Sequence, residues 1–184
     1  MDFIKVSSTL LEDFRRQNIH YSVIGGFALG FWGVTRATID MDFLLLLDDA
    51  DKADDILRRY QYRQTYRSEN VARYESDQVA FGTIDIIYAF RDISKAMLSR
   101  SVTVKVQSGL SIQSLIPEDI IGLKVQAIAN DPDREAQDIA DIRALLATKK
   151  NNSQNTDWVL LESYFELFEL ENLFNELKES YGQT

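Results

Sequence analysis

The first half of the chain alternates between helix-like and strand-like patterns of apolar residues. Apolar positions recur at roughly helical spacing over residues 3–18, which predicts an amphipathic helix. A short β-favouring run from Tyr21 to Ile24 then meets the pair Gly25-Gly26, and an apolar segment over residues 27–32 follows. This order predicts a strand, a tight glycine turn and a short helix.

A continuous apolar run begins a few residues later. Residues 40–47 read DMDFLLLL, and the unbroken apolar stretch 43–47 predicts a strand that is buried on both faces in the middle of a sheet. The acidic cluster at 48–51 suits the first turn of a helix that continues to about Tyr60. Further strands are predicted over residues 71–74, 79–81, 83–89 and 102–106, with a short helix over 93–100.

The pattern becomes purely helical from Pro117, a residue well suited to the first position of a helix. Helices are predicted over residues 117–130, 133–148 and 157–180, separated by polar breaks. We therefore predict an α+β protein in two parts. A small mixed sheet flanked by helices occupies residues 1–113, and a helical bundle packed on it occupies residues 114–184.

The composition excludes several kinds of site. The 184 residues contain no cysteine and one histidine, which rules out disulfides, thiolate metal sites, cysteine nucleophiles and histidine-rich metal sites. The formal net charge of -9 argues against a general basic surface for nucleic acid. A local basic strip could still come from the arginines at 58, 59, 63 and 67, although this spacing is more typical of a solvated helix face.

The start of the chain lacks the basic and apolar regions of a signal peptide. Apolar runs also stay well short of the ~20 residues that a membrane-spanning helix needs. We therefore expect a cytoplasmic protein with no membrane partner.

Two carboxylates stand where the central strand begins. Side chains alternate along a strand, so Asp40 and Asp42 point to one face while Met41 points to the other. Such a pair can share Mg²⁺ or Mn²⁺, because these ions prefer oxygen ligands and accept substrate phosphates in the rest of their shell. Asp85 is the candidate third ligand, since it is an isolated acid in an apolar strand. Three carboxylates could support two metals and accept a proton.

The glycine pair gives these acids a context. Glycine allows unusual backbone angles and close approach, and amides at a strand-to-helix turn can bind phosphate. We interpret Gly25-Gly26 as the seat of a nucleoside triphosphate. An ordinary glycine turn with solvated acids is the alternative. Asp-x-Asp alone also occurs in metal-dependent glycosyltransferases, but the chain looks too short for their usual two-part fold.

Two segments resemble a known family. GGFALGFWGVTRATIDMD, with thirteen residues between Gly26 and Asp40, resembles the nucleotidyltransferase superfamily related to DNA polymerase β. Within that superfamily it resembles the AbiEii type, which includes MenT-type toxins. A later segment, PEDIIGLKVQAIANDPDREAQDIADIRAL, is similar to the family's Pro-Glu-Asp helix start, lysine and Asp-x-x-Asp helix. The resemblance implies a nucleotidyltransferase core followed by a C-terminal helical bundle.

The resemblance also implies roles for individual residues. It assigns catalysis and metal binding to Asp40, Asp42 and Asp85, and nucleotide binding to Gly25, Gly26, Arg36, Thr38, Lys124 and Asp138. Lys124 would reach the phosphates, and Asp138 would orient Lys124 or the substrate. Arg36 could approach a phosphate or simply pack. An ion-pair ladder along one helix face is the alternative for Asp138 and its neighbours.

The leading hypothesis is a metal-dependent transfer of a nucleoside monophosphate from an NTP to an acceptor hydroxyl. In a toxin-like protein with an antitoxin partner, the acceptor would be RNA, such as a tRNA 3′ end. The alternative acceptor is a small molecule, and the acidic net charge favours this version. The alternative is a non-catalytic nucleotide-binding or protein-interaction module. Its hints are Gln137, where family members commonly carry a basic residue, and the aromatic tail 158–174, which would pack in the core or form a homodimer face.

Overall fold

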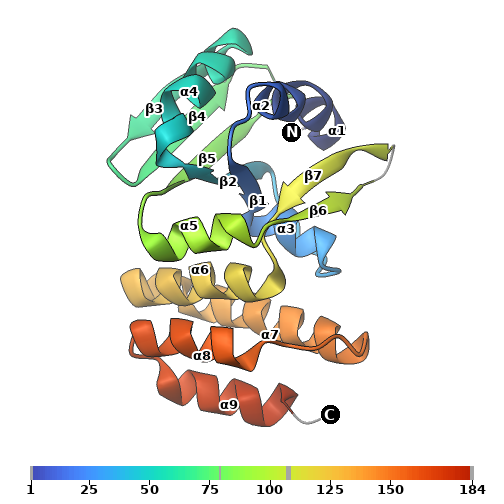
Figure 1. Ribbon diagram of the computed structural model, residues 1–184, viewed down its shortest axis with the longest axis vertical. Coiled ribbons are helices and arrows are strands. Elements are labelled where there is room, and N and C mark those ends of the chain that lie inside the picture. Colours follow the sequence, from blue (N-terminus) through green and yellow to red (C-terminus); the bar gives the residue numbers. More distant parts are fainter. Residues whose placement is uncertain (1, 79, 107–108, 183–184) are drawn as a thin grey trace. The chain divides into compact units, whose positions relative to one another are not determined.

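The computed structural model describes residues 2–78, 80–106 and 109–182 (Figure 1). It divides into two compact units. The first comprises Met1–Ala28 and Arg36–Leu115, and the second comprises Leu29–Thr35 and Ile116–Thr184. Within the described residues, no helix is both long and apolar enough to span a lipid bilayer.

The first unit is built on a mixed sheet. Within the described residues it has seven strands in the order β3-β4-β5-β2-β1-β7-β6. The strands are β1 (Tyr21–Ile24), β2 (Asp40–Leu46), β3 (Tyr62–Arg67), β4 (Val71–Ser76), β5 (Thr83–Ala89), β6 (Val102–Lys105) and β7 (Ser111–Ser114). β2 is parallel to β5 and β1 is parallel to β7, whereas the other neighbouring strands are antiparallel.

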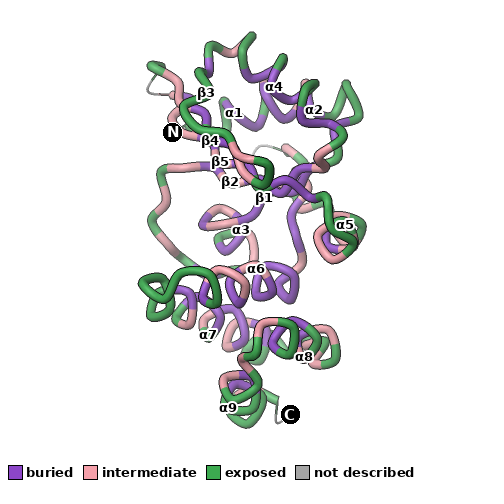
Figure 2. Tube along the Cα trace, turned by 90° about the vertical axis from the view of Figure 1, so that its left-hand side faces the viewer, coloured by how far each residue is buried: buried purple, intermediate pink, exposed green. Residues whose placement is uncertain are grey.

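The prediction of a central strand is confirmed by β2, which lies between β1 and β5. Phe43, Leu44 and Leu45 are completely buried, so the strand is covered on both faces over this stretch. Every residue of β1 is also buried, as Figure 2 shows. Such continuous burial explains the apolar run that made the strand recognisable in the sequence.

The helices of the first unit flank this sheet. They are α1 (Phe3–Val6), the π-helical η1 (Ser7–Leu11), α2 (Glu12–Arg16), the 3₁₀ turn η2 (Leu47–Asp49), α4 (Ala50–Arg59) and α5 (Asp92–Ser99). Phe14 of α2 packs with Tyr21 and Phe43, with ring centroids 5.3 to 5.9 Å apart. Because Phe43 points toward α2, the alternation of side chains directs Asp40 and Asp42 to the opposite face of β2.

The sequence patterns did not predict two of the strands, and they predicted one strand where the structure has a turn. β3 is an edge strand whose residues after Tyr62 are all exposed, so it lacks the apolar alternation that reveals a half-buried strand. Arg63 and Arg67 therefore lie on a strand rather than on a helix face. β7 was also not predicted. Of the strand predicted over residues 79–81, Ala80 and Phe81 form a turn, and residue 79 lies outside the described residues.

The second unit is helical. Its elements are α6 (Pro117–Asn130), the 3₁₀ turn η4 (Pro132–Arg134), α7 (Glu135–Asn151), α8 (Trp158–Leu167) and α9 (Glu171–Tyr181). α6 packs against α7 and α8, and α9 also packs against α7 and α8 (Figure 1). The helix predicted over 157–180 is in fact two, because Glu169 has a φ of 58°, a left-handed conformation that ends α8.

Polar side chains of α6 are buried within this second unit. Glu118 accepts a hydrogen bond from Lys149 of α7 at 2.5 Å, and Asp119 accepts one from the Tyr164 hydroxyl of α8 at 2.6 Å. Gly122 lets the Tyr164 ring approach, because a Cβ there would lie 2.7 Å from the ring carbons. These contacts hold α6 against both neighbouring helices and satisfy polar groups that would otherwise be costly to bury.

Candidate active site

The turn between β1 and α3 (Gly25–Phe31) forms one wall of the candidate site. Gly25 has a φ of 64°, a left-handed conformation that glycine adopts without strain. A Cβ at this position would overlap the carboxylate of Asp42, so the side chain of Asp42 lies directly against the Gly25 backbone. The predicted phosphate seat and one of the predicted acids are therefore neighbours.

Gly26 has a different neighbour. A Cβ at Gly26 would lie 2.7 Å from the Cβ of Thr38, so Thr38 packs closely on the glycine turn. The Thr38 hydroxyl donates a hydrogen bond to the backbone carbonyl of Asp40 at 3.1 Å. Thr38 thus connects the turn to the start of β2, and Arg36, two residues before it, is half-buried.

The three predicted acids lie on neighbouring strands. Asp42 of β2 is the register partner of Asp85 of β5, and these two strands are parallel. Register partners in a sheet direct their side chains to the same face, and Asp40 shares that face because it is two residues from Asp42. All three side chains are half-buried. The backbone therefore gathers the three acids on one face beside the glycine turn.

Arg73 of β4 is a further charged residue on this face. It is the register partner of Asp85 across the antiparallel pair β4–β5. Its Nε donates to Asp85 Oδ1 and its Nη2 donates to Asp85 Oδ2, both at 2.8 Å. The hydrogen bonds and charge of Asp85 raise the pKa of Arg73, and the charge of Asp40 adds to this effect. Arg73 is therefore a permanent cation at the edge of the acidic group.

These contacts decide how well the residues suit a divalent ion. Asp40 and Asp42 offer carboxylate oxygens on one face, which are the donors that Mg²⁺ and Mn²⁺ prefer. Asp85 is in position by its backbone, but its carboxylate is engaged by Arg73. Accordingly, the described residues contain no set of three acidic or histidine side chains arranged to hold a metal. Metal binding by Asp40 and Asp42 and the role of Asp85 as a ligand therefore stay predictions.

Lys124 and Asp138, the other predicted nucleotide-binding residues, belong to the second unit. The Lys124 ammonium donates to Asp138 Oδ1 at 2.7 Å and to Asp141 Oδ2 at 2.6 Å, and Lys124 is only 7% exposed. Arg134 donates to the other oxygen of Asp138 at 3.2 Å. The structure thus brings Lys124 and Asp138 together in a buried ion cluster, and their contact with a nucleotide stays a prediction.

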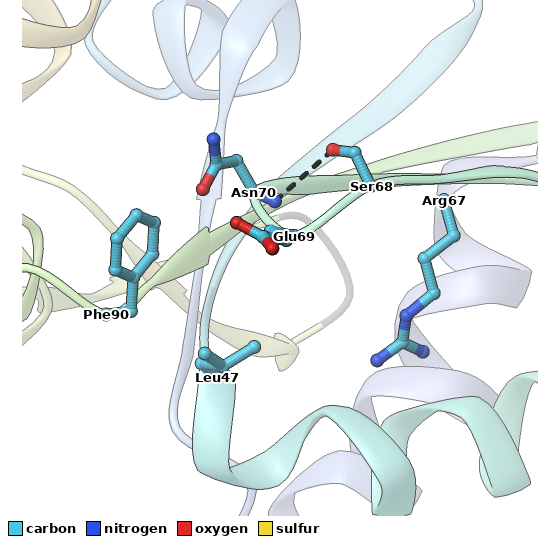
Figure 3. A pocket seen from close by; sticks show the side chains of 6 residues that line it. All are labelled: Leu47, Arg67, Ser68, Glu69, Asn70 and Phe90. Carbon is cyan, nitrogen blue, oxygen red and sulfur yellow. Dashed lines mark hydrogen bonds between the residues drawn. The ribbon is translucent and has the colours of Figure 1, made fainter.

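A cavity of about 480 Å³ lies at another part of the sheet (Figure 3). Its lining comes from the ends of β2 and β5 and from the β3–β4 turn: Leu47, Arg67, Ser68, Glu69, Asn70 and Phe90. Leu47 is five residues beyond Asp42, or roughly 16 Å along an extended strand. The cavity therefore lies beyond the carboxyl ends of β2 and β5, away from the candidate site at the other end of β2.

Arg73 is not recognisable as a site residue from the sequence alone. The alternation in the segment Val71–Ser76 marks Arg73 as an outward-facing residue, but it does not reveal which residue of the next strand lies opposite. That register depends on the turn over residues 77–82, which has no recognisable hairpin motif. The sequence offered only an indirect signal for this pair: Asp85 is an isolated acid in one strand, and Arg73 faces outward in the preceding strand.

Comparisons with known proteins place this geometry in a fold. No family model and no curated protein matches the chain. The solution structure of the antibiotic-resistance factor ANT(2″)-Ia matches with a TM-score of 0.69 at 16% identity, over 96% of this chain and 99% of that one. The crystal structure of ANT(2″)-Ia with adenylyl-2″-tobramycin gives a TM-score of 0.65 at 16% identity, over 97% and 98% of the two chains.

A third solved structure is similar over a smaller part. The lincosamide antibiotic adenylyltransferase LnuA with bound lincomycin matches with a TM-score of 0.52 at 16% identity, over 77% of this chain and 94% of that one. Likeness at such low identity shows the fold alone. The chain therefore has the nucleotidyltransferase fold, and the predicted α+β class is confirmed.

Proposed function

We propose that this protein is a nucleotidyltransferase that moves a nucleoside monophosphate from an NTP to a hydroxyl of a small molecule, releasing pyrophosphate. The observation that carries the proposal is the close approach of Asp42 to the Gly25 backbone, with Asp40 and Asp85 on the same face. Carboxylates beside a glycine-lined turn are suited to a divalent ion and a triphosphate, whereas packing alone gives no reason to gather them.

The residues divide the chemistry between them. Backbone amides of the turn at Gly25 and Gly26 would bind phosphate oxygens, and Asp40 and Asp42, which lies against the Gly25 backbone, would hold a Mg²⁺ or Mn²⁺ ion. When bound, that ion would offset negative charge on the phosphates. The acceptor oxygen attacks the α-phosphorus and the bond to pyrophosphate breaks. Asp85 accepts the proton that the acceptor hydroxyl loses.

A small-molecule acceptor is favoured by two observations. The match to ANT(2″)-Ia covers nearly all of both chains, and the complex of that protein contains an adenylylated small molecule, adenylyl-2″-tobramycin. The formal net charge of -9 is also better suited to a cationic small molecule than to the phosphates of RNA. An RNA acceptor with an antitoxin partner, as in AbiEii-type systems, is the competing version.

The test is label transfer from each of four α-labelled NTPs, with Mg²⁺ or Mn²⁺, to either a panel of hydroxylated amines or total tRNA. We expect transfer to a small molecule that falls at least ~100-fold in Asp42→Asn. Asp48→Asn is the matched control, because Asp48 is an exposed acid just beyond β2 and should leave the rate unchanged. Transfer to tRNA alone would identify the RNA version, and absence of transfer to any acceptor would refute the proposal.

One observation favours a second candidate, a nucleotide-binding module without catalysis. Asp85, the proposed proton acceptor, already has both carboxylate oxygens engaged by Arg73. In that case an NTP with Mg²⁺ would raise the melting temperature, and Asp42→Asn would abolish this rise. Label would not be transferred to any acceptor.

A further inference from the structure

The ion pair between Arg73 and Asp85 has a geometry suited to replacing a metal. The guanidinium contacts both carboxylate oxygens at 2.8 Å through Nε and Nη2, which is the bidentate arrangement that fixes an arginine most firmly. The two residues are register partners on adjacent strands, so the sheet itself holds them opposite one another. A carboxylate held in this way has its strongest acceptor directions occupied.

The charge of Arg73 also disfavours a second metal ion near Asp85. Arg73 offsets the negative charge of Asp85, the acid of this face that lies on β5. A second divalent ion near Asp85 would have to displace or approach a guanidinium that stays protonated at any working pH, and like charges at contact distance repel.

We propose that Arg73 is a resident counter-cation for Asp85 and limits the site to one divalent ion, held by Asp40 and Asp42. This inference rests on the proposed function, because it concerns the same acids. Arg73 is a positioning residue in this scheme: it keeps the Asp85 carboxylate fixed beside Asp42 and out of the metal shell. The site thereby differs from the two-metal arrangement that three carboxylates on one face would otherwise support.

The experiment counts Mn²⁺ ions bound per chain, by electron paramagnetic resonance of free Mn²⁺, with a saturating non-hydrolysable ATP analogue. We expect one ion in the wild-type protein and two in Arg73→Gln, which releases Asp85. Arg73→Lys should restore one ion, because it keeps the positive charge. The matched control is Arg63→Gln, an exposed arginine on β3 that pairs with Asp77 at 3.0 Å, and it should bind one ion.

A second measurement does not depend on the arginine variants folding well. Because Asp85 lies outside the metal shell in this scheme, Asp85→Asn should still bind one ion, with a weaker affinity because Arg73 loses its counter-charge and repels the ion. Asp42→Asn, which removes a proposed ligand, should lose the ion at the same Mn²⁺ concentration. Loss of the bound ion in Asp85→Asn at a saturating Mn²⁺ concentration would overturn the inference.

The outcomes separate the inference from the proposed function. Two ions in the wild-type protein, or two in Arg73→Lys, would overturn the role of Arg73 and leave nucleotidyl transfer standing if label transfer is observed. Failure of the wild-type protein to bind Mn²⁺ with or without the analogue would overturn both. One ion in wild-type and in Arg73→Gln alike would refute the counter-cation alone.

Discussion

Gly25 shows how strongly a single position can be constrained. Its left-handed backbone and its contact with the Asp42 carboxylate are independent reasons for glycine at the same residue. Each reason alone disfavours a side chain at this position. A non-glycine residue in the left-handed conformation destabilises the folded state by about 1–3 kcal/mol. A Cβ atom that overlaps the Asp42 carboxylate would force Asp42 to move. The residue therefore matters both for the turn and for the position of a proposed metal ligand.

Gly25→Ala should lower the free energy of unfolding by about 1–3 kcal/mol and lose nearly all NTP binding, because the new methyl group displaces Asp42. Urea unfolding and calorimetric titration with an NTP measure the two effects. Gly30→Ala is the matched control in the same helix. Gly30 is exposed with open space around it, and alanine there should stabilise by about 0.5–1 kcal/mol. Equal behaviour of the two variants would contradict this account.

At the residue scale, the sequence revealed the acids better than their partners. Asp40 and Asp42 could be placed on one face because strand periodicity depends only on local spacing. The contact between Asp85 and Arg73 depends on the register of two strands, which is set by the whole hairpin and is invisible in either segment. The pairing of Lys124 with Asp138 and Asp141 likewise joins two helices, and spacing within one helix does not determine it.

At the scale of elements, polar contacts fix where helices and strands meet. The Asp49 carboxylate accepts hydrogen bonds from the backbone N–H of His20 at 2.9 Å and from Lys52 at 3.0 Å, and it also contacts His20 Nδ1. These contacts join the residue before β1 to the start of α4. Apolar patterns predicted both elements, but they could not show that one buried acid holds the two together.

Asp49 should make stability depend on pH. Burial alone would raise the pKa of Asp49, but the hydrogen bonds from His20 and Lys52 outweigh it and lower the pKa below its ordinary value. A lowered pKa in the folded state stabilises the protein above the ordinary pKa of about 3.9, and this contribution is lost as the pH falls through the folded value. Asp49→Asn should therefore be less stable than wild type above about pH 4, and the gap should narrow at lower pH.

Thermal unfolding of both proteins from pH 7 downward measures this effect. Asp48→Asn serves as the control, since Asp48 is the exposed neighbour in the same turn and should show no such narrowing. A constant difference between wild type and Asp49→Asn across the whole range would contradict the assignment.

The ion cluster between α6 and α7 carries the third prediction. Lys124 is buried against two carboxylates, so Lys124→Met leaves two negative charges that lose their shared cation. Breaking a buried ion pair from one side costs about 3–5 kcal/mol. Urea unfolding should show a loss of this size, compared with less than ~0.5 kcal/mol for Lys95→Met on the exposed side of α5. A stable Lys124→Met protein would mean that Lys124 is not needed to hold α6 against α7.

At the scale of the whole molecule, the division into units differs from a simple cut of the chain. Residues 29–35 belong with the helices after residue 115, although the strand-turn-helix pattern places them in the first half. Within the second unit, a Cβ at Gly33 would lie 3.2 Å from the Thr148 side chain of α7. The composition of residues 29–35 does not reveal that they belong to the second unit, because they are as apolar as the start of α3, which lies in the first unit.

A fragment of residues 116–184 should therefore be less stable than one in which residues 29–35 are joined to it through a flexible linker. Leu29 and Val34 are buried, and one such side chain contributes about 1.5–3 kcal/mol. Thermal unfolding followed by circular dichroism should give a melting temperature at least ~5 °C higher for the linked fragment. The control carries the same segment with Leu29 and Val34 changed to serine. Equal melting temperatures for all three would show that the segment adds nothing to the second unit.

β3 is an edge strand of the sheet, and its exposed edge affects how readily the protein aggregates in concentrated solution. Unpaired backbone groups on an edge strand can pair with another polypeptide. Along that edge β3 carries the exposed cation Arg67 and also Arg63, whose charge Asp77 partly offsets. Two copies meeting there would bring like charges together, so mutual repulsion guards against fibrous growth. Added salt weakens that repulsion, and turbidity during storage should therefore rise with ionic strength.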